Sequence, residues 1–285
     1  MVAPELTLAA PGPSGARGPR ARFAHTGIVL AAGWLALLTI SALAAIAGAG
    51  ADPLANDYEA INEPPSLAHL FGTDSLGRDI FSRSMHGAAA SGLVALLTVV
   101  LGGGVGILIG VLAGLVRGAV EAFVGFVTDV TIALPSLIIV SAVVTLAGPS
   151  ILTIGLIISA FTIPLFARLA RAVTLSIATE NHVLVARTLG ASGWRILTRE
   201  VLPAVLPLMM PVLMTTVAGA IVAEGALSFL GFGLRPPEPS WGALIAQGRA
   251  ELSTASWLTL FPALMICITI LSVNVLGEHF REASR

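Results

Sequence analysis

Six long apolar runs restrict this chain to a narrow set of folds. They cover roughly residues 27–49, 90–116, 122–147, 151–170, 203–233 and 256–277. A helix of about 20 apolar residues crosses the ~30 Å hydrocarbon layer of a bilayer, so each run is long enough to span it. Hydrophobic residues form 56% of the chain and charged residues only 11%, which is more apolar surface than a soluble domain can bury. The sequence therefore predicts an all-α polytopic membrane protein with six transmembrane helices.

The arginines predict how these helices are oriented. With a cytoplasmic N-terminus, eleven arginines fall on the inside and four on the outside, as expected because basic residues are enriched on the cytoplasmic side of membranes. We therefore expect both termini and the 171–202 loop in the cytoplasm, and the segments 50–88 and 234–255 outside. The protein would then be a multi-pass component of the cell (cytoplasmic or inner) membrane.

Composition divides the chain into four parts. Residues 1–24 are rich in Pro, Gly and Ala and predict a disordered cytoplasmic tail. We assign 25–50 to a first transmembrane helix, because this run is longer than the core of a usual signal peptide, the alternative reading. Residues 51–89 form an extracytoplasmic segment, and 90–285 form a five-helix core. A net charge of −1 gives no indication of nucleic-acid binding.

Four glycines in the second run repeat every four residues, at Gly102, Gly106, Gly110 and Gly114. This spacing places them on one side of a helix, where they let another helix approach closely. The approaching helix could belong to the same chain or to a partner subunit, and the pattern leaves both alternatives open.

The most informative segment is polar and lies between the fourth and fifth apolar runs, at 181–203. Gly190 can end one short helix with a tight turn, and Ser192 can cap the next. We expect Trp194, Leu197 and Val201 to share an apolar face of this second helix, because they follow i, i+3, i+7 spacing. Such an element suits a groove on a partner protein, although an amphipathic helix resting on anionic lipid is the alternative.

A second motif lies in the outer segment, before the second run. It contains Gly72, Thr73, Asp74, Gly77, Arg78 and Asp79. We expect Asp74 to cap a helix that starts near Ser75, because short acidic side chains accept hydrogen bonds from free N–H groups at helix starts. The segment could be a folded lid that holds the spans together, or a contact surface for an extracytoplasmic protein.

Two carboxylates interrupt the apolar runs, Asp129 in the third run and Glu224 in the fifth, with Ser228 one turn after Glu224. A carboxylate at bilayer depth is costly and faces the interior of a helix bundle. These groups could be hydrogen-bonded structural anchors, could line a translocation path or gate, or could relay protons. No activated nucleophile, metal-ligand cluster or cofactor motif accompanies them, so we expect no catalytic residue, metal or cofactor in this chain.

Three motifs together resemble one family. The motif Ala186-Arg-x-Leu-Gly190-Ala-Ser192 resembles the cytoplasmic loop by which ABC-importer permeases dock onto their ATPases. The outer motif at 69–83 resembles the dipeptide/oligopeptide/nickel branch of these permeases. So do the run from Glu224 to Gly233, with Leu227-Ser-Phe-Leu-Gly231, and the Pro-x-Pro-Ser-Trp-Gly run that ends at Gly242. The resemblance covers roughly residues 66–282.

This resemblance implies a type I ABC-importer permease architecture and a set of partners. The chain would be a permease subunit of an ATP-driven importer of peptides or related solutes, forming half of the translocation pathway in the lipid bilayer. The implied partners are a second homologous permease, two ATPase subunits that bind ATP and Mg, and an extracytoplasmic solute-binding protein. The implied docking residues are Ala186, Arg187, Leu189, Gly190, Ala191, Ser192, Trp194, Arg195 and Ile196.

The chain also departs from the family pattern. Permeases of this kind usually carry Glu-Ala-Ala before the arginine of the loop, whereas this chain has Leu184, Val185 and Ala186. The chain has no lysine and no Gly-x-x-x-x-Gly-Lys-[Ser/Thr] loop, so it cannot cradle ATP by that motif and is not expected to be an enzyme. The rival function is a proton-coupled secondary transporter that uses Asp129 and Glu224.

Overall fold

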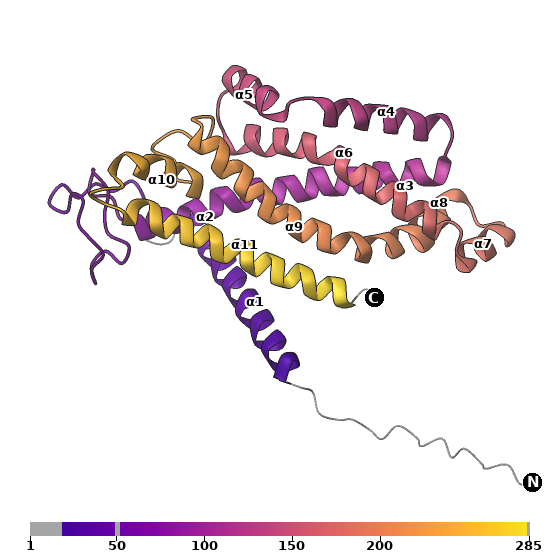
Figure 1. Cartoon of the computed structure of the whole chain (residues 1–285), viewed down its shortest axis with the longest axis horizontal. Helices are drawn as coiled ribbons and strands as arrows, with labels where there is room; N and C mark the ends of the chain where they lie inside the picture. Colours follow the sequence, from indigo (N-terminus) through magenta and orange to yellow (C-terminus); the bar gives the residue numbers. More distant parts are fainter. Residues whose placement is uncertain (1–18, 49–51, 284–285) are drawn as a thin grey trace, which may run out of the picture.

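The computed structural model describes residues 19–48 and 52–283, and helices form most of this part of the chain (Figure 1). Its helical elements are α1 (Pro19–Ile46), α2 (Ile80–Leu97), η1 (Thr98–Val105), α3 (Gly106–Val116), α4 (Ala119–Ala133), α5 (Ser136–Ala147), α6 (Ile151–Ile177), α7 (Asn181–Thr188), α8 (Gly193–Arg195), η2 (Ile196–Val201), α9 (Leu202–Phe229), α10 (Trp241–Gly248), η3 (Arg249–Glu251) and α11 (Trp257–Ala283). The β-structure in these residues is one isolated bridge, between Thr73 and Asp79. The all-α prediction is confirmed.

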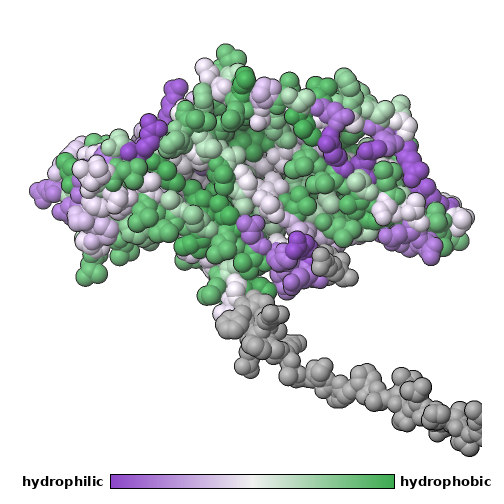
Figure 2. Space-filling view, viewed as in Figure 1, coloured by the Kyte–Doolittle hydropathy of each residue, from purple (hydrophilic) through white to green (hydrophobic). Residues whose placement is uncertain are grey.

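Five helical segments in the described residues are long and apolar enough to cross a membrane. They are Thr26–Ile46, Ile80–Val116, Ile151–Ile177, Gly193–Phe229 and Trp257–Glu282. A sixth crossing is present if the bent pair α4 and α5 counts as one span. Polar surface gathers at the two ends of the molecule and apolar side chains cover much of the middle (Figure 2), as expected for a protein surrounded by lipid.

The third apolar run is not one straight helix, which corrects the expectation for 122–147. α4 and α5 are bent by 83° at a short break, where Leu134 is extended with ψ 137° and precedes Pro135. The proline ring clashes with the helical conformation of the preceding residue, so the helix ends there. α4 and α5 both pack against α6, and the bend changes the direction of the chain between them (Figure 1).

The second span begins ten residues earlier than the apolar run suggested, at Ile80. Asp79 is its N-cap and accepts a 2.7 Å hydrogen bond from the Ser82 N–H. The first helix also begins early, because residues 19–24 belong to α1 and not to a disordered tail. The rest of that predicted tail, residues 1–18, lies outside the described residues.

The glycine stripe packs against a helix of the same chain. Gly102, Gly106, Gly110 and Gly114 all lie against α6, which leaves no room for a side chain at any of them. A methyl group on Gly106 would lie 2.6 Å from the carbonyl oxygen of Ile163 and 2.7 Å from Cβ of Phe166. Of the two alternatives for this stripe, the structure therefore shows packing within the chain.

The two ends of the bundle carry different elements (Figure 1). One end holds the segment 52–79 and α10, and the other holds α7 and α8. α11 runs back from the first end toward the second and ends before it reaches α7 (Figure 1). α1 crosses the bundle obliquely and is fixed by the 3.0 Å hydrogen bond from Trp34 Nε1 to Thr269 Oγ1 of α11.

Gly106→Ala should destabilise the bundle, because the added methyl group would push α3 away from the backbone of α6. We expect the free energy of unfolding to fall by about 1–3 kcal/mol. The matched control is Gly104→Ala, two residues earlier, where no atom lies within 4 Å of the added group. Unfolding of the purified chain in detergent measures both, and equal stability of the two variants would contradict the close α3–α6 contact.

Candidate functional site: a docking element and two polar anchors

The loop between α6 and α9 folds into two short helices joined at Gly190. Gly190 has φ +75°, a conformation that only glycine adopts at little cost. Its N–H donates to the Arg187 carbonyl, and the Ala191 N–H donates to the Ala186 carbonyl, both at 3.0 Å. These two bonds form a Schellman motif that ends α7. Ser192 then caps α8 by accepting a bond from the Arg195 N–H at 3.3 Å, as the sequence predicted.

One side of this loop is anchored in the helix bundle. Val183 of α7 and Ile196, Leu197 and Val201 of η2 are buried. They belong to a single apolar cluster that also contains side chains from α3, α6 and α9, among them Val111, Phe166 and Val205. A displacement of the loop would therefore push on α3, α6 and α9 together, because packed interiors transmit strain.

The other side of the loop is exposed and carries both apolar and basic side chains, the latter including Arg187 and Arg195. Leu189 is 81% exposed and Trp194 is 73% exposed. Trp194 lines a pocket together with Leu197, but the predicted common face with Leu197 and Val201 is divided, because those two side chains are buried while Trp194 is exposed. The π-helical turns of η2 alter the regular spacing on which that prediction depended. A 380 Å³ pocket lies beside the indole, between α8–η2 and the end of α3.

Glu224 is the centre of a polar anchor inside the bundle. Its side chain is buried, at 1% exposure, and accepts hydrogen bonds from three hydroxyl groups. Ser91 of α2 donates to Oε2 at 2.9 Å, and Ser228 of α9 and Ser240 donate to Oε1 at 2.8 and 2.7 Å. Ser240 is also the N-cap of α10. The carboxylate thus joins α2, α9 and α10, which matches the anchor reading of its role.

Asp129 lies apart from this anchor. Its side chain is 72% exposed on α4 and pairs with Arg168 of α6, which is 51% exposed. A second ion pair, between Glu121 and Arg171, joins the same two helices. Of the three predicted path residues, the structure therefore brings Glu224 and Ser228 together and places Asp129 on a separate surface.

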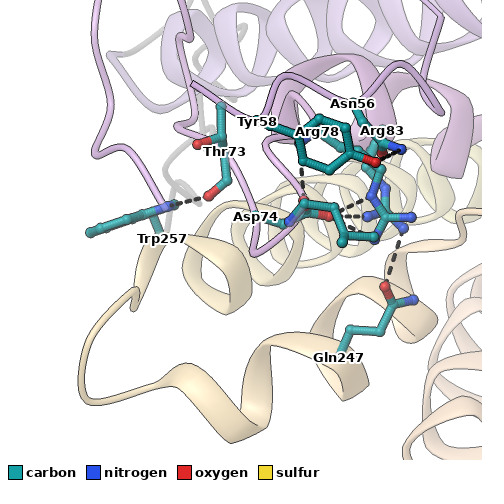
Figure 3. A network of polar contacts seen from close by, with 9 residues as sticks. Asn56, Tyr58, Thr73, Asp74, Arg78, Arg83, Gln247 and Trp257 are labelled. Atoms are coloured by element: carbon teal, nitrogen blue, oxygen red, sulfur yellow. Dashed lines mark hydrogen bonds and ion pairs between the residues drawn. The ribbon is translucent and has the colours of Figure 1, made fainter. Parts of the chain in front are cut away.

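The outer motif forms one compact turn around Asp74. The Asp74 carboxylate accepts bonds from the backbone N–H groups of Leu76 and Arg78 at 2.9 and 3.0 Å. It also pairs with the guanidinium groups of Arg78 and Arg83 (Figure 3). The expectation that Asp74 caps a helix near Ser75 is wrong. The chain turns at Gly77, with φ +72°, and Asp79 caps the helix instead.

Further contacts fasten this outer segment to the spans. Thr73 is fully buried, and its carbonyl accepts a 3.1 Å bond from Trp257 Nε1 at the start of α11. Gly72 packs against the same indole. Arg83 donates to Gln247 Oε1 of α10 at 3.2 Å (Figure 3). The segment is thus a folded cap that is tied to α2, α10 and α11.

Some of these partners were not identified from the sequence. Ser91, Ser240 and Gln247 had no assigned role, because a serine in an apolar helix or a glutamine in an outer loop carries no local signal. Ser240 could have been found as a helix cap, since it directly precedes Trp241 and a short apolar helix. Its bond to Glu224 depends on a tertiary contact across 16 residues.

This arrangement of helices defines a multi-spanning membrane protein with an exposed loop of two short helices at one end and a folded cap at the other. Residues 106–284 match the family model described as "Binding-protein-dependent transport system inner membrane component". The chain belongs to this family. It is accordingly the permease component of an ABC importer.

Curated relatives agree with this assignment. The chain is 38% identical over 227 residues to the glutathione transport system permease protein GsiD of Escherichia coli, and 35% identical to that of Pectobacterium atrosepticum. Each match covers 80% of this chain and 75% of the relative. GsiD of Shigella sonnei is also 38% identical over 227 residues.

Substitutions at Glu224 should separate an anchor from a gate. Glu224→Gln keeps the size and an acceptor oxygen, so we expect nearly normal folding. Glu224→Leu leaves three buried hydroxyl groups without their acceptor, which should lower the free energy of unfolding by about 3 kcal/mol or more. Unfolding of the purified chain measures both, with Glu238→Leu on an exposed loop as control. Normal assembly of Glu224→Leu, with only transport altered, would instead assign Glu224 to the path.

Proposed function

We propose that this chain forms one half of the translocation pathway of an importer for small peptides. Its partners would be a second permease, two cytoplasmic ATPase subunits that bind ATP and Mg, and an extracytoplasmic solute-binding protein. The relatives are named for glutathione, which is itself a tripeptide, and this supports a peptide-like solute. The arginine distribution supports a cytoplasmic position for α7, α8 and both termini.

The observation that carries this proposal is the two-sided construction of the α7–η2 loop. Its exposed side presents Leu189 and Trp194 beside an apolar pocket. This surface suits a short helix that binds in a groove of a partner protein. Its buried side belongs to the same cluster as α3, α6 and α9. Closure of the ATPases on ATP would therefore move the loop, and the loop would tilt three spans together to open the pathway outward.

We further propose that the surface of α4 and α6 faces the pathway. Thr128 is the one buried residue of α4, so most of this helix needs a cover from outside the chain. Lipid alone is a poor cover, because exposed charges such as Asp129 and Arg168 are costly in hydrocarbon. A water-filled passage closed on its far side by the second permease would accommodate both the charges and the apolar side chains.

The rival function, a proton-coupled secondary transporter, has less support. Glu224 accepts three hydroxyl bonds and Asp129 is paired with Arg168, so both carboxylates are engaged as acceptors. A proton relay needs groups that exchange protons with water during the cycle. Family membership also favours ATP as the energy source.

Gly190→Pro should uncouple the ATPases from the permease. Proline fixes φ near −65°, whereas Gly190 has φ +75°, and proline also removes the N–H that bonds Arg187. We expect membrane insertion to be normal and solute-dependent ATP hydrolysis and uptake by the reconstituted complex to fall by roughly tenfold or more. Gly193→Ala is the matched control, because it lies on the same loop in open space. Normal uptake by a well-assembled Gly190→Pro complex would refute the docking role.

A further inference from the structure

A polar pocket of 240 Å³ lies at the end of the molecule that carries the outer cap. Its polar lining comes from the cap and α2 (Asp74, Ser75, Arg78 and Arg83) and from α10 and η3 (Gln247 and Glu251). These elements differ from α4 and α6, so the pocket is separate from the proposed pathway surface. Its apolar lining includes Leu244 and Leu258, both of which are buried.

Three buried polar atoms of the lining residues have no hydrogen-bond partner in the described part of the chain. They are Arg83 Nε and Gln247 Nε2, which are donors, and Glu251 Oε2, which is an acceptor. The Arg83 side chain is only 1% exposed. Buried polar groups are almost always hydrogen-bonded, so a cluster of three beside one pocket indicates that the pocket supplies their partners.

The charges of the lining are arranged in two parts. Arg78 and Arg83 share the single carboxylate of Asp74 (Figure 3), so that group of three side chains keeps a net positive charge. Arg83 uses its two terminal nitrogens on Asp74 and on Gln247 Oε1, so Nε is the nitrogen of its guanidinium group that has no partner. On η3, Glu251 contributes a carboxylate with an unused oxygen.

We propose that this pocket binds a single amino-acid-sized zwitterion. Its carboxylate would accept bonds from Arg83 Nε and Gln247 Nε2, because charge-assisted bonds between guanidinium and carboxylate are strong. Its ammonium group would donate to Glu251 Oε2, and an aliphatic side chain would lie against Leu244 and Leu258. The pocket holds the equivalent of about eight waters at ~30 Å³ each, which is too small for a long peptide. This site is additional to the proposed transport pathway and does not depend on it.

The experiment measures binding of L-alanine to the full-length chain in lipid nanodiscs by ligand-observed NMR. L-alaninamide, which lacks the carboxylate, and N-acetyl-L-alanine, which lacks the ammonium group, are the comparison ligands. We expect L-alanine to bind saturably at millimolar concentration and each analogue to bind roughly tenfold more weakly or worse, since each loses one charge-assisted contact. Absence of saturable L-alanine binding would overturn the proposal and leave a water-filled pocket.

Two variants assign the ligand groups to residues. Glu251→Gln should abolish the preference for L-alanine over N-acetyl-L-alanine, and Gln247→Leu should reduce the preference for L-alanine over L-alaninamide. Glu238→Gln, on the exposed loop before α10, is the matched control and should bind L-alanine normally. Melting temperatures show whether each variant is folded. If Glu251→Gln does not fold, the ligand preference of Gln247→Leu tests the proposal. Unchanged preferences in folded variants would place any binding elsewhere.

Discussion

The surrounding lipid is the constraint on which the rest of this structure depends. Hydrocarbon offers no hydrogen bonds, so each polar group inside the bundle needs a partner from the protein. Glu224 shows the consequence most directly, because three serine hydroxyl groups from three parts of the chain converge on one carboxylate. Asp129 and Arg168 lack such cover and pair with each other on the exposed surface of α4 and α6.

Close helix packing allows a movement of one helix to be passed to its neighbours. The glycines of the second span let α3 lie directly against α6, and the α7–η2 loop inserts its buried side chains into the same region. A turn with positive φ at Gly190 separates this anchored side from the exposed Leu189. The loop can therefore receive a force from a partner protein on one side and pass it to three spans on the other.

Features that depend on local sequence could be predicted, and features that depend on tertiary contacts could not. Apolar run length predicted the spans, and the Gly190–Ser192 spacing predicted a turn and a cap that the structure contains. The break before Pro135 was not predicted, because a proline inside a span is also compatible with a kinked but continuous helix. The role of Asp74 was misassigned because its carboxylate accepts the N–H groups of Leu76 and Arg78 within a turn, and the helix begins only after Asp79. Its link through Arg83 to Gln247 of α10 could not be foreseen. Trp194 is more exposed than Leu197 and Val201 because regular helical spacing does not continue into η2.

The central claim is that the exposed side of the α7–η2 loop contacts a cytoplasmic ATPase. Cysteine cross-linking tests it most directly, because Cys267 is the chain's single cysteine and Cys267→Ser removes it. In that background, a short thiol cross-linker should join Leu189→Cys to the ATPase in assembled complexes, and should not join Leu271→Cys, which is exposed on α11. Failure of Leu189→Cys to cross-link in a complex that hydrolyses ATP normally, or its labelling from the outside of intact cells, would contradict the claim.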